Sequence, residues 1–136
     1  MKYLEARDHL FGIVRDANLG IPINWQDVVG DTPATESTWA RVWLAHSIGE
    51  QASLSCENGM KRWRSAGTLV IQIYEPVANG RRDGYNIAQK LVDALRNYRH
   101  DNLWLRRPQM AEYGSQGNYS QTRVTAFFEY DDYGSL

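Results

Sequence analysis

The sequence contains a single cysteine, Cys56, among its 136 residues. One cysteine cannot form a disulfide within the chain, and this usage is typical of a protein that folds in a reducing compartment. No apolar run approaches the roughly 18 residues that a membrane-spanning helix requires. Residues 1–8 are too polar for a signal peptide, so we expect a protein that is made in a cytoplasm and has no membrane partner.

The chain also lacks an excess of charge of either sign, because 15 basic and 16 acidic residues give a net charge of −1. This balance argues against a general nucleic-acid binder. The charges are unevenly distributed along the chain. Residues 61–107 carry ten basic and four acidic side chains, a balance of +6, whereas residues 1–60 carry −4 and residues 108–136 carry −3. This asymmetry favours a role for the charges in contacts.

No recognised catalytic motif is present, since the sequence has no phosphate-binding glycine loop, no zinc-protease helix and no nucleophile elbow. The residues most often recruited for catalysis are His9, His46, Cys56 and His100. None of them has a second ligand or a catalytic partner at a recognised spacing. We therefore predict structural or incidental roles for all four, no enzymatic activity and no cofactor.

An acidic group near the C-terminus, Glu129, Asp131 and Asp132, could in principle hold a metal ion. A hard cation needs several converging oxygens, usually from a defined loop. Glu129 and Asp131 share one face of a predicted strand, whereas Asp132 belongs to the other. We predict a solvated strand end here and no metal site.

Residues 64–76 alternate between two sets of side chains in the way that is typical of a half-buried strand. Pro76 ends this strand, and a glycine-containing loop follows. Asp83 is predicted to cap the next helix, in which apolar residues recur at helical spacing. The predicted core comprises Leu69, Ile71, Ile73, Ile87, Leu91, Leu95, Val124 and Phe128.

The remaining segments complete the order helix, short strand, strand, strand, helix, strand, strand. Periodicity predicts a helix over 2–17 and strands over 23–25, 39–46, 103–107, 109–113 and 119–130. Residues 131–136 are predicted to be a loose tail. The sequence thus predicts one domain over residues 1–136 of the α+β class, with a mostly antiparallel sheet packed by two helices.

The segment Ser47–Trp63 is long for a connection inside a compact domain. It is predicted to extend a strand into a hairpin, because Asn58-Gly59 is a strong hairpin-turn dipeptide. We expect this segment to reach beyond its own domain toward a neighbouring molecule, since loops with tryptophan and arginine commonly serve binding.

Tryptophan and arginine side chains that lie close together are a second signal of function. Trp39 and Trp43 share a predicted strand face with Arg41, and protein interfaces are enriched in aromatic residues and arginine. The predicted interface residues are Trp39, Arg41, Trp43, Arg62, Trp63, Arg64, Arg81 and Arg82. An alternative is a small nucleic-acid-binding module that uses the basic segment 61–107, since guanidinium groups beside stacking surfaces also bind nucleic acid.

The stretch Gly-Thr-Leu-Val-Ile-Gln-Ile-Tyr-Glu-Pro-Val-Ala-Asn-Gly over residues 67–80 precedes a helix with Ala88, Leu91, Ala94 and Leu95. This pattern resembles the small tail-terminator (tail-completion) proteins of long-tailed bacteriophages. The order of the other elements is similar too, including a last strand that ends in aromatic residues over 127–130. The resemblance covers nearly the whole chain.

The resemblance implies an α+β structural virion protein, found in the tail and neck of the particle. Six copies would form a ring on the end of the tail tube, stop tube polymerisation and join the tail to the head. The implied partners are further copies of the chain, the tail tube protein and a neck or head-completion protein, while DNA only passes through the lumen. A neck or head-completion protein of the same particle is the alternative. In such a ring, Arg62, Arg64, Arg81 or Arg82 is expected to meet acidic residues of the next subunit.

Overall fold

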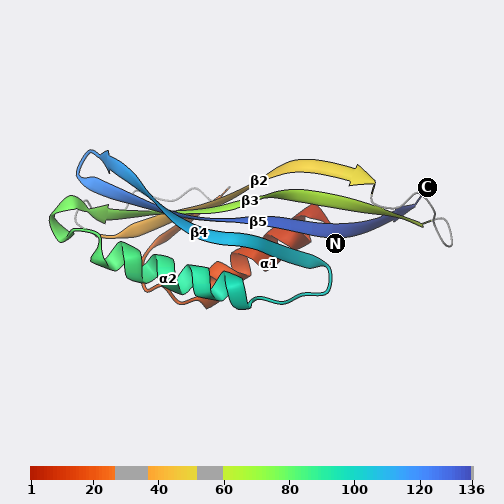
Figure 1. Cartoon of the computed structure of the whole chain (residues 1–136), viewed down its shortest axis with the longest axis horizontal. Coiled ribbons are helices and arrows are strands. Elements are labelled where there is room, and N and C mark those ends of the chain that lie inside the picture. The colour runs from red at the N-terminus through yellow and green to blue at the C-terminus, as the bar shows by residue number, and fades with distance from the viewer. Residues whose placement is uncertain (27–36, 52–59, 136) are drawn as a thin grey trace.

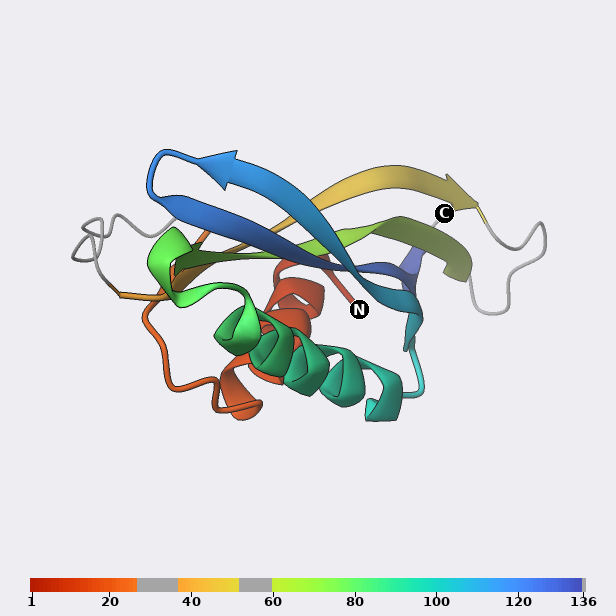
Figure 2. The ribbon, with the colours of Figure 1, turned by 60° about the vertical axis from the view of Figure 1, so that its left-hand side comes forward.

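The computed structural model describes residues 1–26, 37–51 and 60–135. Its elements are α1 (Tyr3–Asp16), β1 (Ile23–Trp25), β2 (Trp39–Gln51), β3 (Met60–Pro76), the short 3-10 turn η1 (Val77–Asn79), α2 (Arg82–Asn97), β4 (Leu103–Gln116) and β5 (Tyr119–Ser135). This is the predicted order. Both helices lie on the same face of one sheet (Figures 1 and 2), which confirms the predicted α+β class.

The sheet has five strands in the order β1-β2-β3-β5-β4. The short β1 runs parallel to β2, and the other neighbours are antiparallel. β3 and β5 are therefore the central strands, and each residue of β3 from Met60 to Pro76 has a partner on β5. β3 and β5 thus form a continuous ladder in the sheet, and both helices can pack against it.

The core lies between the helices and the facing side of this sheet. All the predicted core residues are buried, and they belong to one core cluster with the buried face of α1 formed by Ala6, Leu10, Ile13 and Val14. Tyr3 of the same helix is 67% exposed. It lies in the first turn, where its ring contacts the His46 ring edge-on at 4.9 Å. Fraying first turns commonly lie at the margin of a core.

The N-terminus of α2 is capped by the side chain of Glu75, which lies at the end of β3, before the loop that leads to the helix. The prediction that Asp83 caps this helix is therefore wrong. The Glu75 carboxylate accepts hydrogen bonds from the backbone N–H groups of Asp83 and Gly84, each at 3.1 Å. Gly80, at φ 71°, turns the chain back so that the helix begins over the end of β3. Glu75 is only 2% exposed, and this burial raises the pKa of its carboxyl group.

Replacement of this cap is expected to destabilise the protein measurably. Glu75→Ala removes an acceptor for two backbone N–H groups at a helix N-terminus, a change that typically costs about 0.5–2 kcal/mol. Glu75→Gln keeps one amide oxygen as an acceptor and should lose less. Urea unfolding followed by circular dichroism tests this order, and an alanine variant as stable as wild type would contradict the capping role.

The C-terminal part of the sheet differs from the prediction in two ways. The predicted strands around Pro108 are one strand, β4, with a bulge where Arg107 takes a positive φ of 52°. β5 continues to Ser135, so residues 131–135 are not a loose tail. Asp131 is buried and binds Arg64 at 3.1 Å, and Asp132 binds Lys2 at 2.9 Å. The acidic group is therefore an ion-paired strand end, not a solvated one.

β2, β3 and β5 continue past the ends of both helices (Figure 1). β2 and β3 remain paired there as far as Gln51 and Trp63, and β3 and β5 as far as Met60 and Ser135. The predicted strand extension over 47–63 is thus confirmed on both sides, while the predicted hairpin tip lies outside the described residues. None of the described helices is long and apolar enough to span a membrane.

Candidate interaction surface

The sheet face opposite the helices carries no described helix (Figure 2). Because side chains alternate along a strand, this open face receives the odd-numbered residues of β2 as far as Ala45, the odd-numbered residues of β5 and the even-numbered residues of β3. We define the arginine–aromatic cluster on it as Trp39, Arg41, Trp43, Gln72, Tyr74, Tyr113 and Arg123. The members come from the four long strands, so only the folded sheet brings them together.

One half of the cluster is built around an aromatic stack. The rings of Trp39 and Tyr74 are 4.3 Å apart and 13° from parallel. The guanidinium of Arg41 lies over both rings, at 5.6 Å from Trp39 and 6.0 Å from Tyr74. Cation–π contacts of this kind contribute about 0.5–1 kcal/mol at exposed sites. Arg41 itself is exposed, so its charge remains accessible to a partner.

The other half is centred on Arg123, which the sequence analysis did not single out. Its guanidinium lies 4.5 Å from the Tyr113 ring and 5.7 Å from the Trp43 ring. Its Nε donates to the side-chain oxygen of Gln72 at 2.7 Å, and Gln72 is almost fully buried. The alternation of residues 119–130 already placed Arg123 on this face, and only the pairing of β3 with β5 shows its neighbours.

The predicted tryptophans do not share one environment. Trp39 is only 6% exposed, Trp43 is half-buried, and Trp63 on the helix-free extension is 39% exposed. Trp39 is covered by its stack with Tyr74, so it supports the surface rather than forming the outermost layer. Phe127, which was not predicted, is 44% exposed on the same face and borders a depression of about 370 Å³.

Two of the predicted arginines are held within the chain. Arg64 binds Asp131 and lies 5.5 Å from the Trp104 ring. Arg81 donates to the backbone oxygens of Gln121 and Tyr113, so it fastens the start of α2 to the sheet. The basic segment 61–107 is spread over several elements, from β3 through α2 to β4.

The other predicted arginines lie apart from these two. Arg82 is exposed at the start of α2, and the side chain of Arg62 lies outside the described part. An interface role for all of the predicted residues stays a prediction.

The three histidines lie in two separate places, and neither place has the set of ligands that a metal ion requires among the described residues. Among the described residues, no three histidine, cysteine or acidic side chains converge as metal ligands. His46 Nε2 lies 2.6 Å from the Tyr130 hydroxyl, and burial lowers the pKa of His46. His9 and His100 meet edge-on at 4.7 Å, with the Tyr98 hydroxyl 3.2 Å from His9 Nδ1. Cys56 lies outside the described residues.

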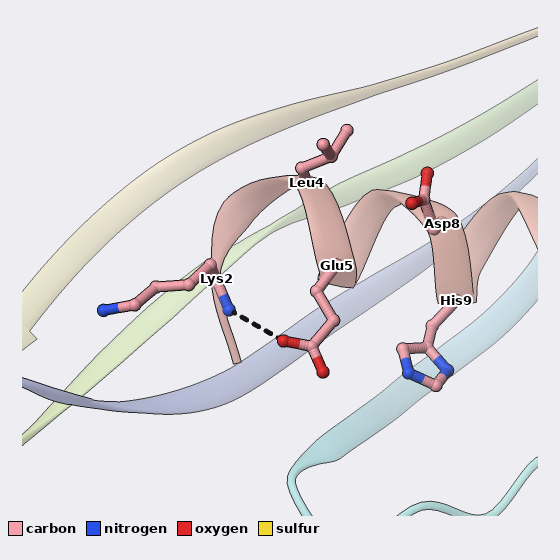
Figure 3. Close-up of a pocket in the computed structure, with 5 residues that line it drawn as sticks. All are labelled: Lys2, Leu4, Glu5, Asp8 and His9. Atoms are coloured by element: carbon pink, nitrogen blue, oxygen red, sulfur yellow. Dashed lines mark hydrogen bonds between the residues drawn. The ribbon is translucent and has the colours of Figure 1, made fainter.

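A hollow of about 470 Å³ lies beside the first turns of α1, and its polar side chains do not point toward one another. It is lined by Lys2, Leu4, Glu5, Asp8 and His9. Figure 3 shows Leu4 and Asp8 pointing one way and Glu5 and His9 the other. Glu5 accepts a hydrogen bond from the backbone N–H of Lys2 at 3.4 Å, so its carboxylate caps the helix. The lining side chains of this hollow do not converge on a common point.

Because Tyr130 is buried, the free energy of unfolding is expected to fall as the pH rises in the alkaline range. Burial raises the pKa of Tyr130 to about 12, above the ordinary value of 10. Its contribution to stability is therefore fully present below about pH 10 and is lost as the pH rises through about 12. We expect unfolding free energies measured between pH 9 and about 12 to fall more steeply for wild type than for Tyr130→Phe. Parallel curves would contradict the burial of a neutral phenol.

No protein-family model and no curated protein matches the chain. Among solved structures, 28 chains match. One of them aligns with 99% of this chain and 100% of its own chain, at a TM-score of 0.56 and 14% sequence identity. At this identity the likeness supports the fold alone.

Proposed function

We propose that this chain is a structural assembly protein of a long-tailed bacteriophage, similar to the tail terminators that its sequence resembles. Copies of the chain form a ring of six on the end of the tail tube, stop its polymerisation and provide the surface that joins the tail to the neck. The active groups of such a protein are binding surfaces. The protein belongs in the virion and is assembled in the host cytoplasm.

The observation that carries this proposal is the helix-free sheet face with its arginine–aromatic cluster. An exposed sheet face with accessible arginine and aromatic side chains is the composition that protein interfaces favour. The cluster is rigid before any partner binds, because stacking and the bond from Arg123 to Gln72 fix its members. A preorganised surface loses less side-chain entropy when a partner binds.

The extension of β2, β3 and β5 past the helices supports the same function. A compact catalytic domain has no need for strands that leave its core, whereas a ring subunit can use them to reach its neighbours or the tube. The extension is held by pairing along the whole length of β3 and by the ion pair between the partly exposed Arg64 and the buried Asp131.

The proposal is tested by tube polymerisation. Tail tube protein of the same phage is polymerised with and without the purified chain, and tube lengths are measured by electron microscopy. We expect wild type to stop elongation and leave a ring on the tube end. Tube lengths that do not change at any ratio of the two proteins would contradict the terminator function. Binding to neck proteins alone would favour the neck-protein alternative.

A matched pair of variants separates surface from fold. Arg41→Glu reverses an exposed charge on the open face, and Lys90→Glu makes the same change on the exposed side of α2. Lys90→Glu should unfold at nearly the wild-type temperature, since exposed substitutions usually change stability by no more than about 0.5 kcal/mol. Arg41→Glu also loses its cation–π contacts and should cost about 1 kcal/mol, which leaves the protein folded. We expect only Arg41→Glu to reduce capping. Equal capping by the two variants would contradict a role of the open face in capping the tube.

A further inference from the structure

We propose that the first two turns of α1 in one copy dock onto the open sheet face of the next copy, with Leu4 against Phe127 and Asp8 against Arg107. The receiving site is the depression beside Phe127, and its occupant is a second copy of the chain. The docking deepens the proposed function, because it says which two surfaces of neighbouring subunits meet. It rests on that function for the number of copies in the ring.

The depression lies where two strands of the sheet are irregular. The register of β2 shifts between His46 and Ile48, and that of β4 shifts between Arg106 and Gln109. Bulges of this kind re-aim the side chains beside them. Between these two strands, the residues of β3 that line the depression are small. The depression measures about 370 Å³, and its lining includes Ser47, Ala66, Gly67, Arg106, Arg107 and Phe127.

The depression offers an apolar wall beside a positive charge. Phe127 supplies the wall, since its side chain is exposed on the open face. Arg106 and Arg107 both line the depression, although neighbouring residues of a regular strand point to opposite faces. Arg106 lies 3.7 Å from Glu129, whereas Arg107 is exposed and pairs with no acidic side chain of the described residues. A complementary occupant therefore has an apolar side chain next to a carboxylate.

The first two turns of α1 present this combination. Tyr3 and Leu4, at 67% and 60%, are the most exposed large apolar side chains of the described residues. The carboxylate of Asp8 is also exposed, and it lies 3.8 Å from the guanidinium of Arg7. Leu4 and Asp8 are one helical turn apart and point the same way (Figure 3), so one partner surface can meet both.

The start of α1 and the depression lie back to back across the sheet. On the face that carries the helices (Figure 2), the rings of Tyr3 and His46 meet with their centres 4.9 Å apart. His46 pairs with Gly67, and Gly67 lines the depression on the open face. The two surfaces are therefore at the same level along the strands.

This level placement is what a closed ring requires. In a cyclic assembly each copy uses two different patches, one toward each neighbour. Patches at the same height along the symmetry axis close a ring, whereas patches at different heights produce a helical filament. Since the two surfaces are level along the strands, the ring closes with the strands running roughly along its axis.

The same orientation gives the helix-free extension a position in the ring. β2, β3 and β5 all pass the ends of the helices on one side of the molecule (Figure 1). With the strands along the axis, the extensions of all copies project from the same end of the ring. There they can contact the tail tube or a neck protein.

A charge-reversal pair tests the contact. Asp8→Arg and Arg107→Asp are made as separate chains, and aspartate tolerates the positive φ of 52° at position 107. Native mass spectrometry follows each chain and their equal mixture at several concentrations, alone and with tail tube protein. Each variant alone should need at least about a tenfold higher concentration than wild type to assemble, because like charges then meet. The mixture should assemble as wild type does, into rings with three copies of each chain.

Asp16→Arg is the matched control. Asp16 is exposed and lies beside an arginine of α1, as Asp8 does, but about 12 Å further along the helix. This variant should assemble as wild type does, and its rings should exclude the Arg107→Asp chain. Circular dichroism verifies that all three variants are folded.

The outcomes separate the docking from the proposed function. If wild type forms rings of six but the mixture does not assemble, or if either reversal alone assembles as wild type does, the docking is overturned and the ring stands. Assemblies with equal numbers of the two chains but a total other than six would uphold the docking and contradict the proposed ring.

The apolar part of the contact has its own test. Leu4→Ala should raise the concentration needed for assembly by about tenfold or more, since a leucine side chain then no longer leaves water. Val77→Ala, an exposed apolar position at the far end of β3, should have no such effect. Equal assembly by the two variants would overturn the contact of Leu4 with Phe127.

Discussion

Gly67→Ala is expected to destabilise the protein by about 3 kcal/mol, the upper end of the usual cost of overpacking a core. A Cβ added at Gly67 would lie 2.2 Å from the backbone oxygen of Ala45 and 2.6 Å from the Phe128 ring. Gly67 is in the central strand β3 and pairs with Phe128 on β5 and His46 on β2. Neither strand can move away without breaking its ladder, so the strain cannot be relieved locally.

Gly114→Ala provides the matched control for this prediction. Gly114 is in the exposed part of β4, and an added Cβ there meets no atom within 4 Å. Its stability should stay within about 0.5 kcal/mol of wild type. Urea unfolding of both variants is the measurement, with circular dichroism to establish that each is folded. If Gly67→Ala were as stable as Gly114→Ala, the close approach of β2, β3 and Phe128 would be wrong.

Leu91→Ala is expected to cost about 2–5 kcal/mol, as a leucine truncated in a closed core usually does. Leu91 is fully buried, in the face that α2 turns toward the sheet together with Ile87 and Leu95. Truncation leaves a cavity between two rigid layers, and a long strand ladder cannot collapse into it. The melting temperature should fall by several degrees in consequence.

The adjacent exposed residue supplies the comparison for Leu91. Lys90→Ala replaces one good helix former with another and should leave the free energy of unfolding nearly unchanged. If the Leu91→Ala and Lys90→Ala proteins had the same melting temperature, the two-layer packing would be contradicted. Because the substitution acts on the subunit itself, the loss should be seen whether or not rings form.

The elements and the core could be predicted because their signals are local. The alternation around Leu69 and Ile71 fixed the face of β3, and the spacing of Ile87, Leu91 and Leu95 fixed the face of α2. Each signal depends on residues within a few positions of one another. The open face could be anticipated in part for the same reason, since Trp39, Arg41 and Trp43 are alternate residues of one strand.

The remaining features depend on contacts between distant residues. Glu75 caps α2 because the loop after Pro76 folds back. No sequence pattern around Asp83 indicates that the cap comes from the preceding strand. The predicted loose tail is strand because Arg64 binds Asp131, a pair separated by 67 residues. Arg123 becomes the centre of a cluster only through the register of β3 with β5.

The central claim is that the chain assembles into rings of six, and native mass spectrometry tests it most directly. The full-length protein is measured over a range of concentrations, alone and with the tail tube protein of the same phage. We predict a species with six times the mass of the chain, and no stable species between the monomer and that ring. Monomers or dimers alone at every concentration, also in the presence of tube protein, would contradict the account.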